Sequence, residues 1–303
     1  MVRYFAVADF TFALEMFSDD PLWGAIGAYE PFEVEAESCS DIMFRVEVAQ
    51  DDVECEREFV LSNGGDDPKM VKVDIYREVG ESQELRGYIF DIFHPQQPTL
   101  SSILHLRSDF SGGVVVANGD LQQRLFVLNN ALILSFMSAG LMRDAIFFHA
   151  SVVTYRSCGY LFLGRSGTGK STHSQMWMRC SSEVELLNDD HPIVRIKDGG
   201  EVRVYGSPWS GKTPCYRNLS APVGGVIRIK QASENRLKRL GGVASYASLT
   251  TSASMFNWCE ELNDLKSKLL NRLISRVACW QMEALPNVEA AQVAMEGVVC
   301  VDE

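Results

Sequence analysis

Residues 164–171 of this chain read Gly164-Arg165-Ser166-Gly167-Thr168-Gly169-Lys170-Ser171 and fit the pattern G-x-x-x-x-G-K-[ST] at every fixed position. A short apolar, β-prone run precedes the pattern at residues 159–163, and residues 172–179, which contain no Gly or Pro, follow it. These flanks predict a strand, a tight glycine turn and a helix N-terminus, where backbone N–H groups and the helix dipole face an anion. A chance match in a glycine-rich turn is disfavoured because both flanks fit the motif.

The motif gives specific roles to its last residues. We expect Lys170 to reach the β- and γ-phosphates of ATP, and the Ser171 hydroxyl to hold Mg²⁺. The expected nucleotide contacts run from Gly164 through Thr172. The sequence therefore predicts ATP and Mg²⁺ as cofactors.

The second informative feature is an acidic pair, Asp189-Asp190, at the end of an apolar strand predicted at residues 184–187. One helix and one return strand separate this pair from Lys170, so we expect it beside the triphosphate. One carboxylate can bind Mg²⁺, directly or through water, and the other can accept the proton of an attacking hydroxyl. Asp190 is the expected metal ligand, although the pattern leaves open which of the two is the base. A polar turn before Pro192 is the alternative interpretation.

Composition argues against several classes of protein. The 303 residues suffice for one large domain or two ordinary ones, and the formal net charge of −12 argues against a nucleic-acid-binding surface. No run approaches the roughly 18 apolar residues that span a bilayer, and the N-terminus lacks the apolar region of a signal peptide. The eight cysteines are scattered, with no C-x-x-C and no Cys/His cluster at zinc spacing. We therefore expect reduced thiols in a cytoplasmic protein.

The chain is expected to divide into two domains. Residues 1–117 read as short strands separated by turns and predict a small β-rich domain of unknown role. Residues 118–303 are expected to form the nucleotide domain, which opens with a helix at about 121–142. The basic stretch 228–239 is interpreted as a solvated helix face. Further expected elements are strands at 146–154 and 160–163 and helices at 255–277 and 288–296.

Three segments together resemble the HPr kinase/phosphorylase family: His149-Ala150-Ser151-Val152-Val153, the glycine motif, and Asp189-Asp190. Members of that family carry a His on the strand before the phosphate-loop strand, a Walker-type loop, and an Asp pair one helix later. The resemblance covers roughly residues 120–230, and more loosely the rest of the C-terminal half, but not residues 1–117. It implies an α/β fold with a phosphoenolpyruvate carboxykinase/HPr-kinase-like P-loop domain and a mixed sheet, preceded by the small β-rich N-terminal domain.

The resemblance also implies roles for individual residues. His149 matches the family's active-site histidine, Lys170 the phosphate-binding lysine, Ser171 a Mg²⁺ ligand, and Asp189-Asp190 the acid/base site. By itself, a histidine on an apolar strand is more often a packed core residue than a catalyst. The place of His149 just before the phosphate-loop hairpin favours the catalytic role.

The sequence departs from the family after the Asp pair. The family's metal-binding Glu has no counterpart, because no acidic residue follows Glu201 in the corresponding segment, which ends in Pro208-Trp209-Ser210-Gly211-Lys212. This stretch is either an acceptor or phosphate clamp, in which Lys212 stabilises the transferring group, or a surface turn with a packed Trp. Residues 279–303 contain no Lys or Arg, whereas HPr kinases engage their protein partner through a basic C-terminal region. The acceptor is therefore left open.

The expected function is an ATP-dependent kinase acting on a hydroxyl of a small molecule, a peptide or a protein. Positioning, Mg²⁺ and a base suffice for in-line phosphoryl transfer, and each has a candidate here. The alternative is a nucleotide-binding regulatory protein without turnover. A carboxykinase is disfavoured because nothing before the glycine motif resembles an arginine-rich oxaloacetate site. No nucleic-acid or membrane partner is expected, and the resemblance allows a homo-oligomer.

Overall fold

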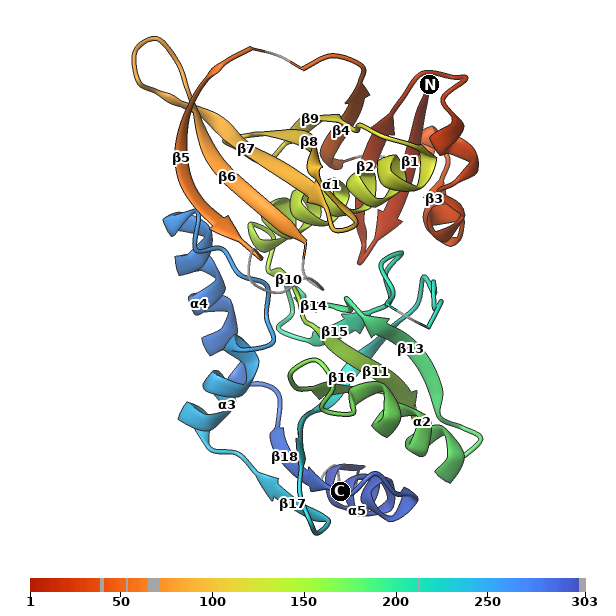
Figure 1. Ribbon diagram of the computed structural model, residues 1–303. Coiled ribbons are helices and arrows are strands. Elements are labelled where there is room, and N and C mark those ends of the chain that lie inside the picture. Colours follow the sequence, from red (N-terminus) through yellow and green to blue (C-terminus); the bar gives the residue numbers. More distant parts are fainter. Residues whose placement is uncertain (39–40, 53, 65–70, 212, 300–303) are drawn as a thin grey trace. The chain divides into compact units, whose positions relative to one another are not determined.

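Figure 1 shows the computed structural model of the chain, which describes residues 1–38, 41–52, 54–64, 71–211 and 213–299. The chain is a mixed α/β protein whose strands form two mixed sheets. Its two compact units are Met1–Gly140 with Asn257–Cys259 (unit 1) and Leu141–Phe256 with Glu260–Glu303 (unit 2). The division falls after the helix expected at about 121–142, whereas the sequence placed the domain boundary before it.

Unit 1 is built on a sheet of mostly antiparallel strands. They are β1 (Val2–Val7), β2 (Phe10–Glu15), β3 (Glu33–Val34), β4 (Ile42–Ala49), β5 (Glu56–Asn63), β6 (Lys72–Val79), β7 (Leu85–His94), β8 (Gln97–Arg107) and β9 (Gly112–Val116). Short 3₁₀ helices occupy Pro21–Gly24, Gly27–Phe32 and Ala36–Ser38. The strand order is β3-β1-β2-β4-β9-β8-β7-β6-β5, and among the described pairs of this sheet only β2–β4 and β4–β9 are parallel.

Helix α1 (Leu121–Leu141) packs on this sheet through its apolar residues. The ring of Phe136, fully buried, lies 6.4 Å from Phe10, 6.4 Å from Phe12 and 6.1 Å from Phe44, measured between centroids. These contacts explain why the helix belongs to unit 1. By length and composition alone α1 could cross a membrane, since it contains an apolar 18-residue window with a mean hydropathy of 1.4. The sequence analysis did not expect this. In the structure, 56% of that window is buried inside the protein.

Unit 2 holds the second sheet. Its strands are β10 (Ala145–Phe147), β11 (Ala150–Tyr155), β12 (Cys158–Leu163), β13 (Glu185–Asp190), β14 (Ile193–Ile196), β15 (Val202–Tyr205), β16 (Ser220–Gln231), β17 (Arg236–Arg239) and β18 (Cys279–Ala284). Its helices are α2 (Lys170–Cys180), α3 (Gly242–Thr250), α4 (Glu260–Ile274) and α5 (Val288–Val299). The order is β10-β14-β15-β16-β12-β11-β13, with β18 paired to β16 and β17 paired to β18.

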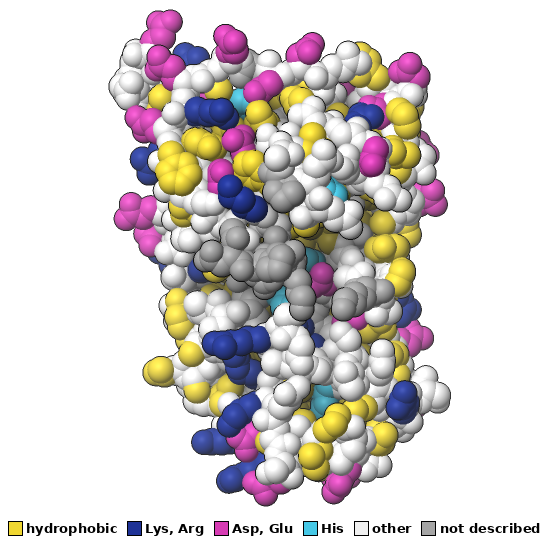
Figure 2. Space-filling model, in the orientation of Figure 1, with side chains coloured by type: hydrophobic (Ala, Val, Ile, Leu, Met, Phe, Trp, Pro, Cys, Tyr) yellow, Lys and Arg dark blue, Asp and Glu magenta, His cyan; other side chains and the backbone are white. Residues whose placement is uncertain are grey.

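Two details of unit 2 differ from the sequence expectation. The single strand expected at 146–154 is interrupted between β10 and β11, because the N–H groups of Phe148 and His149 donate to Pro192 and Ser252 instead of continuing one ladder. The basic stretch expected to be a helix face is instead the end of β16 followed by β17. Arg228 is half-buried, whereas the lysines and arginines from Lys230 onward are exposed, as expected, and those of β17 lie on a strand that pairs with β18. Figure 2 shows Lys and Arg side chains at the lower left, near the place of β17 in Figure 1.

The register of three strands determines where the ends of unit 2's elements meet. Strand β11 pairs antiparallel with β12 on one side and with β13 on the other. Ala150, the first residue of β11, is opposite Leu163 at the end of β12 and Asp190 at the end of β13. Gly164 and His149, which flank this row, therefore lie at the same end of the sheet as Asp190.

Helix α2 is held on this sheet by an aromatic cluster. Trp177 is fully buried, and its ring lies 5.1 Å from that of Tyr160 and 5.3 Å from that of Phe162. Both partners belong to β12, the strand that leads into the glycine motif. The packing of Trp177 therefore fixes the helix relative to the strand before it.

Trp177→Ala should destabilise unit 2 by about 3–5 kcal/mol, because truncating a buried aromatic ring loses its transfer free energy and leaves a cavity. Equilibrium unfolding in urea, followed by circular dichroism, measures the effect. Val243→Ala is the control, since Val243 is 89% exposed and should change the free energy of unfolding by less than about 0.5 kcal/mol. Equal stability of the two variants would contradict the packing described here.

Candidate functional site

The glycine motif forms a turn between β12 and α2. Gly167 and Gly169 have φ of 79° and 100°, a region in which residues with a Cβ are strained, so glycine is required at both positions. Gly169 is the N-cap of α2 and provides no side-chain cap, and the first turn contains no acidic residue. The N–H groups at the start of α2 are therefore left for an anion, with the helix dipole favouring negative charge there.

Lys170 is buried and folded back on the loop that precedes it. Its ammonium donates to the carbonyl oxygen of Gly164 at 3.1 Å and to Nε2 of His149 at 2.8 Å. Burial lowers the pKa of Lys170 below that of an ordinary lysine, although the carboxylates of Asp190 and Asp189 oppose the shift. The ammonium of Lys170 is therefore held beside the glycine turn by two neutral groups, a carbonyl oxygen and an imidazole nitrogen.

The two aspartates contact different partners. The Ser171 hydroxyl donates to Oδ1 of Asp189 at 2.8 Å, whereas Oδ1 of Asp190 lies 2.8 Å from Nδ1 of His149. Successive side chains of a strand point to opposite faces, which explains the difference. The sequence expected Ser171 and Asp190 to share a metal, but the distances pair Ser171 with Asp189.

Asp190 lies between two histidines. Its Oδ2 is 3.3 Å from Nδ1 of His191, in addition to the contact with His149. Burial alone would raise the pKa of Asp190, but the hydrogen bonds with the two histidines outweigh it and hold the pKa well below the usual range of an aspartate. Asp190 is therefore an anion that orients its neighbours, and a weak base.

The contacts of His149 determine its tautomer. An ammonium group can only donate, so Nε2 of His149 accepts from Lys170, and the ring proton on Nδ1 is donated to Asp190. The side chain is 46% exposed, so His149 is not a packed core residue. The result is a carboxylate–imidazole pair whose outer nitrogen faces Lys170.

The segment after β15 covers the Asp pair. The Asn188 amide donates to the hydroxyl of Ser207 at 3.1 Å and to the carbonyl of Trp209 at 3.2 Å, and the Gly211 N–H donates to the carbonyl of Asp189 at 2.9 Å. Trp209 is buried, with its ring 5.4 Å from that of Phe147. The segment thus reaches the end of β13 that carries Asp189 and Asp190, and its Trp is packed. Lys212, the expected charge clamp, lies outside the described residues.

Two parts of the site had not been expected from the sequence. His191 directly follows the Asp pair, and that adjacency was its only signal. The other part is a cavity of about 410 Å³ beside the glycine turn. Among the described residues its lining contains no Asp, Glu, Lys or Arg, and it includes Gly167, Gly169 and Met176 from the turn and α2, and Ile229 and Pro286 from the far side. Long-range strand pairing brings these segments together, and no local motif marks them.

Comparison with known proteins adds little to this geometry. No family model and no curated protein matches the chain. Among solved structures, the Hpr(Ser) kinase/phosphatase from Coxiella burnetii is similar, with 10% sequence identity over 52% of this chain and 99% of that chain, at a TM-score of 0.31. A likeness this low carries no argument, so the site is interpreted from its own residues.

His173 in α2 lines the cavity and is almost completely buried, with its ring 5.0 Å from that of Phe162. Burial lowers the pKa of His173 to about 4 from a usual value of 6.5. Between these values the unfolded chain binds the proton and the folded chain does not, so stability falls as the pH falls through this window.

When the pH is lowered from 7.5 to 5, the free energy of unfolding of the wild type should fall by about 2 kcal/mol more than that of His173→Gln. The reason is that only the wild type must keep a buried imidazole neutral. Urea unfolding of both proteins at the two pH values measures the difference. His94→Gln in unit 1 serves as the control and should retain the wild-type pH dependence. An identical pH dependence of wild type and His173→Gln would show that this imidazole is not desolvated.

Proposed function

We propose that the chain is an ATP-dependent phosphotransferase of the HPr-kinase-like type, acting on a hydroxyl group, and that unit 2 is a P-loop nucleotide domain of that fold. The observation that carries the proposal is the position of His149. One ring nitrogen is bonded to Asp190 and the other to Lys170, at the start of a glycine turn with an uncapped helix. A base, an anchored lysine and an anion site thus converge within one hydrogen-bonded cluster.

The glycine turn and the cavity beside it would bind different parts of the nucleotide. The N–H groups at the start of α2 suit the phosphates, and the adjoining cavity, of a size typical for small-molecule sites, suits the nucleoside. Gln231 donates to the carbonyl of Gly167 at 3.2 Å and ties the turn to the cavity wall. On binding, Lys170 would exchange the Gly164 carbonyl and His149 for the β- and γ-phosphates.

Ser171 and Asp189 are the residues that would hold Mg²⁺. Their oxygens already lie 2.8 Å apart, and a hydroxyl and a carboxylate are the hard ligands that this ion prefers. Bound there, Mg²⁺ would neutralise charge on the phosphate oxygens. This proposal replaces Asp190 as metal ligand by Asp189, because Asp190 is engaged by His149 and His191.

His149 is the proposed base and Asp190 the residue that orients it. A carboxylate whose pKa is held low is a poor proton acceptor, whereas a neutral imidazole with a free Nε2 is a good one. Once Lys170 turns to the phosphates, Nε2 can take the proton of the acceptor hydroxyl. The hydroxyl oxygen then bonds to the γ-phosphorus as the bond to the β-phosphate oxygen breaks and ADP leaves.

Lys170→Ala should weaken the affinity for Mg-ATP by about tenfold or more, because it removes the charge that meets the phosphates. Isothermal titration calorimetry on the full chain measures the affinity. Lys268→Ala, which removes an exposed lysine of α4, is the matched control and should bind ATP as the wild type does. Unchanged affinity in Lys170→Ala would show that the glycine turn does not hold the triphosphate.

His149→Gln and Asp190→Asn should each lower phosphoryl turnover by about 10²–10⁴-fold while leaving ATP affinity within a few-fold, since both residues act on the proton and not on the nucleotide. The rate of ADP formation, with water as the acceptor, is measured beside calorimetric binding. Asp264→Asn, which makes the same change at an exposed carboxylate of α4, is the control. A wild-type chain that binds Mg-ATP but forms no ADP would favour the alternative, a nucleotide-binding regulatory protein.

A further inference from the structure

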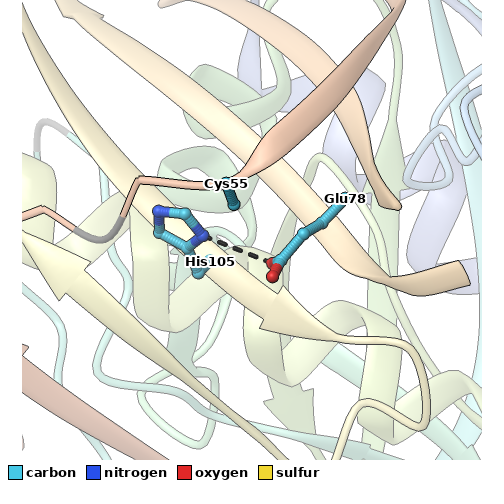
Figure 3. A group of neighbouring side chains, drawn as sticks. All are labelled: Cys55, Glu78 and His105. Carbon is cyan, nitrogen blue, oxygen red and sulfur yellow. Dashed lines mark hydrogen bonds and ion pairs between the residues drawn. The ribbon is translucent and has the colours of Figure 1, made fainter. Parts of the chain in front are cut away.

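Unit 1 contains a group of three side chains that the nucleotide site does not use. Cys55 precedes β5, Glu78 belongs to β6 and His105 belongs to β8. The Cys Sγ, a Glu carboxylate oxygen and a ring nitrogen of His105 all lie within 4.8 Å of one another. Figure 3 shows Glu78 and His105 joined by a dashed contact, with Cys55 beside them.

The distance between His105 and Glu78 is closer to the spacing of two ligand atoms around a metal ion than to that of a good hydrogen bond. Nδ1 of His105 is 3.4 Å from Oε2 of Glu78, which is long for an N–H···O contact. Around a tetrahedral zinc ion, with bonds near 2.1 Å to N and O and 2.3 Å to S, two ligand atoms lie about 3.3–3.6 Å apart. The His105–Glu78 pair already has this spacing, and the Cys55 thiol lies within 4.8 Å of both ligand atoms.

A fourth residue holds the histidine in the orientation that a metal requires. Oδ1 of Asp52 lies 2.8 Å from Nε2 of His105. A neutral ring that donates its Nε2 proton to this carboxylate turns the lone pair of Nδ1 toward Glu78 and Cys55. Such a carboxylate behind the imidazole is the usual partner of a metal-bound histidine.

Strand β7, which lies between Glu78 and His105, leaves room for these two side chains to meet. Glu78 is opposite Gly87 of β7, and His105 is opposite Ile89, the next residue on the same face. Because Gly87 has no side chain, Glu78 can lean across β7 toward β8. A cavity of about 220 Å³ borders both Glu78 and His105, so solvent reaches them.

We propose that Cys55, Glu78 and His105 bind a zinc ion, with Asp52 as the residue that orients His105. One thiolate, one imidazole and one carboxylate form a ligand set typical of zinc, and three protein ligands leave a fourth position for water or a small ligand. The site lies in unit 1 and is independent of the proposed ATP site. A protonated His105 shared by two carboxylates, with a thiol that only happens to be near, is the competing explanation.

Zinc binding by the full, untagged chain tests the proposal. After treatment with a chelator, the protein is titrated with Zn²⁺ against a chromophoric competitor, and we expect one ion per chain. Cys55→Ser and His105→Ala should each weaken affinity by about 100-fold or more, and Asp52→Asn, which keeps all three ligands, by about 10–100-fold. Cys180→Ser and His94→Ala, which change a half-buried thiol and a second imidazole elsewhere, should bind as the wild type does.

Cobalt gives a readout that a merely structural role cannot produce. The Co²⁺-loaded wild type should show a thiolate-to-metal charge-transfer band and the visible bands of tetrahedral Co²⁺. The charge-transfer band should disappear in Cys55→Ser. Because this measurement needs only folded wild type, it decides the matter even where a variant fails to fold. A wild type without the charge-transfer band, or a Cys55→Ser chain with undiminished zinc affinity, would overturn the site.

Discussion

The candidate site depends on one constraint, the double pairing of β11. This strand is antiparallel to both β12 and β13, and Ala150 is opposite the last residue of each. The glycine turn, His149 and Asp190 therefore meet at one end of the sheet. The same register sends Asp189 toward Ser171 and Asp190 toward His149, because side chains alternate along a strand. A slip of one residue would exchange the two carboxylates and abolish both contacts.

Charge is distributed in this cluster so that no buried ion is left without a partner. A buried ammonium is costly unless polar atoms replace its water, and Lys170 has the Gly164 carbonyl and His149 for this purpose. Asp190 is likewise compensated by two imidazoles. The groups that bond Lys170 directly are neutral, so the proposed triphosphate, which offers full negative charge, would displace them. The site is thus arranged before any ligand binds, which lowers the cost of binding.

Unit 1 follows the same principle with different chemistry. Cys55, Glu78 and His105 come from the start of β5, from β6 and from β8, and the register across β7 places a glycine between the last two. In both units, side chains far apart in sequence meet because the register of strand pairing is fixed to the single residue. The cluster in unit 1 stands on its own contacts and shares no residue with the glycine turn. A structural ion there would be expected to stabilise unit 1 without changing the proposed phosphoryl transfer in unit 2.

The sequence by itself determined the strand, glycine turn and helix around Lys170, the strand that ends in Asp189-Asp190, and the strand-rich character of residues 1–117. These features are local, because glycine conformation, helix propensity and alternation act over a few residues. Only the tertiary structure decided that α1 packs in unit 1, that residues 236–239 pair as a strand, that Ser171 meets Asp189 and not Asp190, and that Cys55 lies beside Glu78 and His105. Each of these outcomes rests on strand register or packing between distant segments, and such contacts leave no periodic or spaced pattern in the chain.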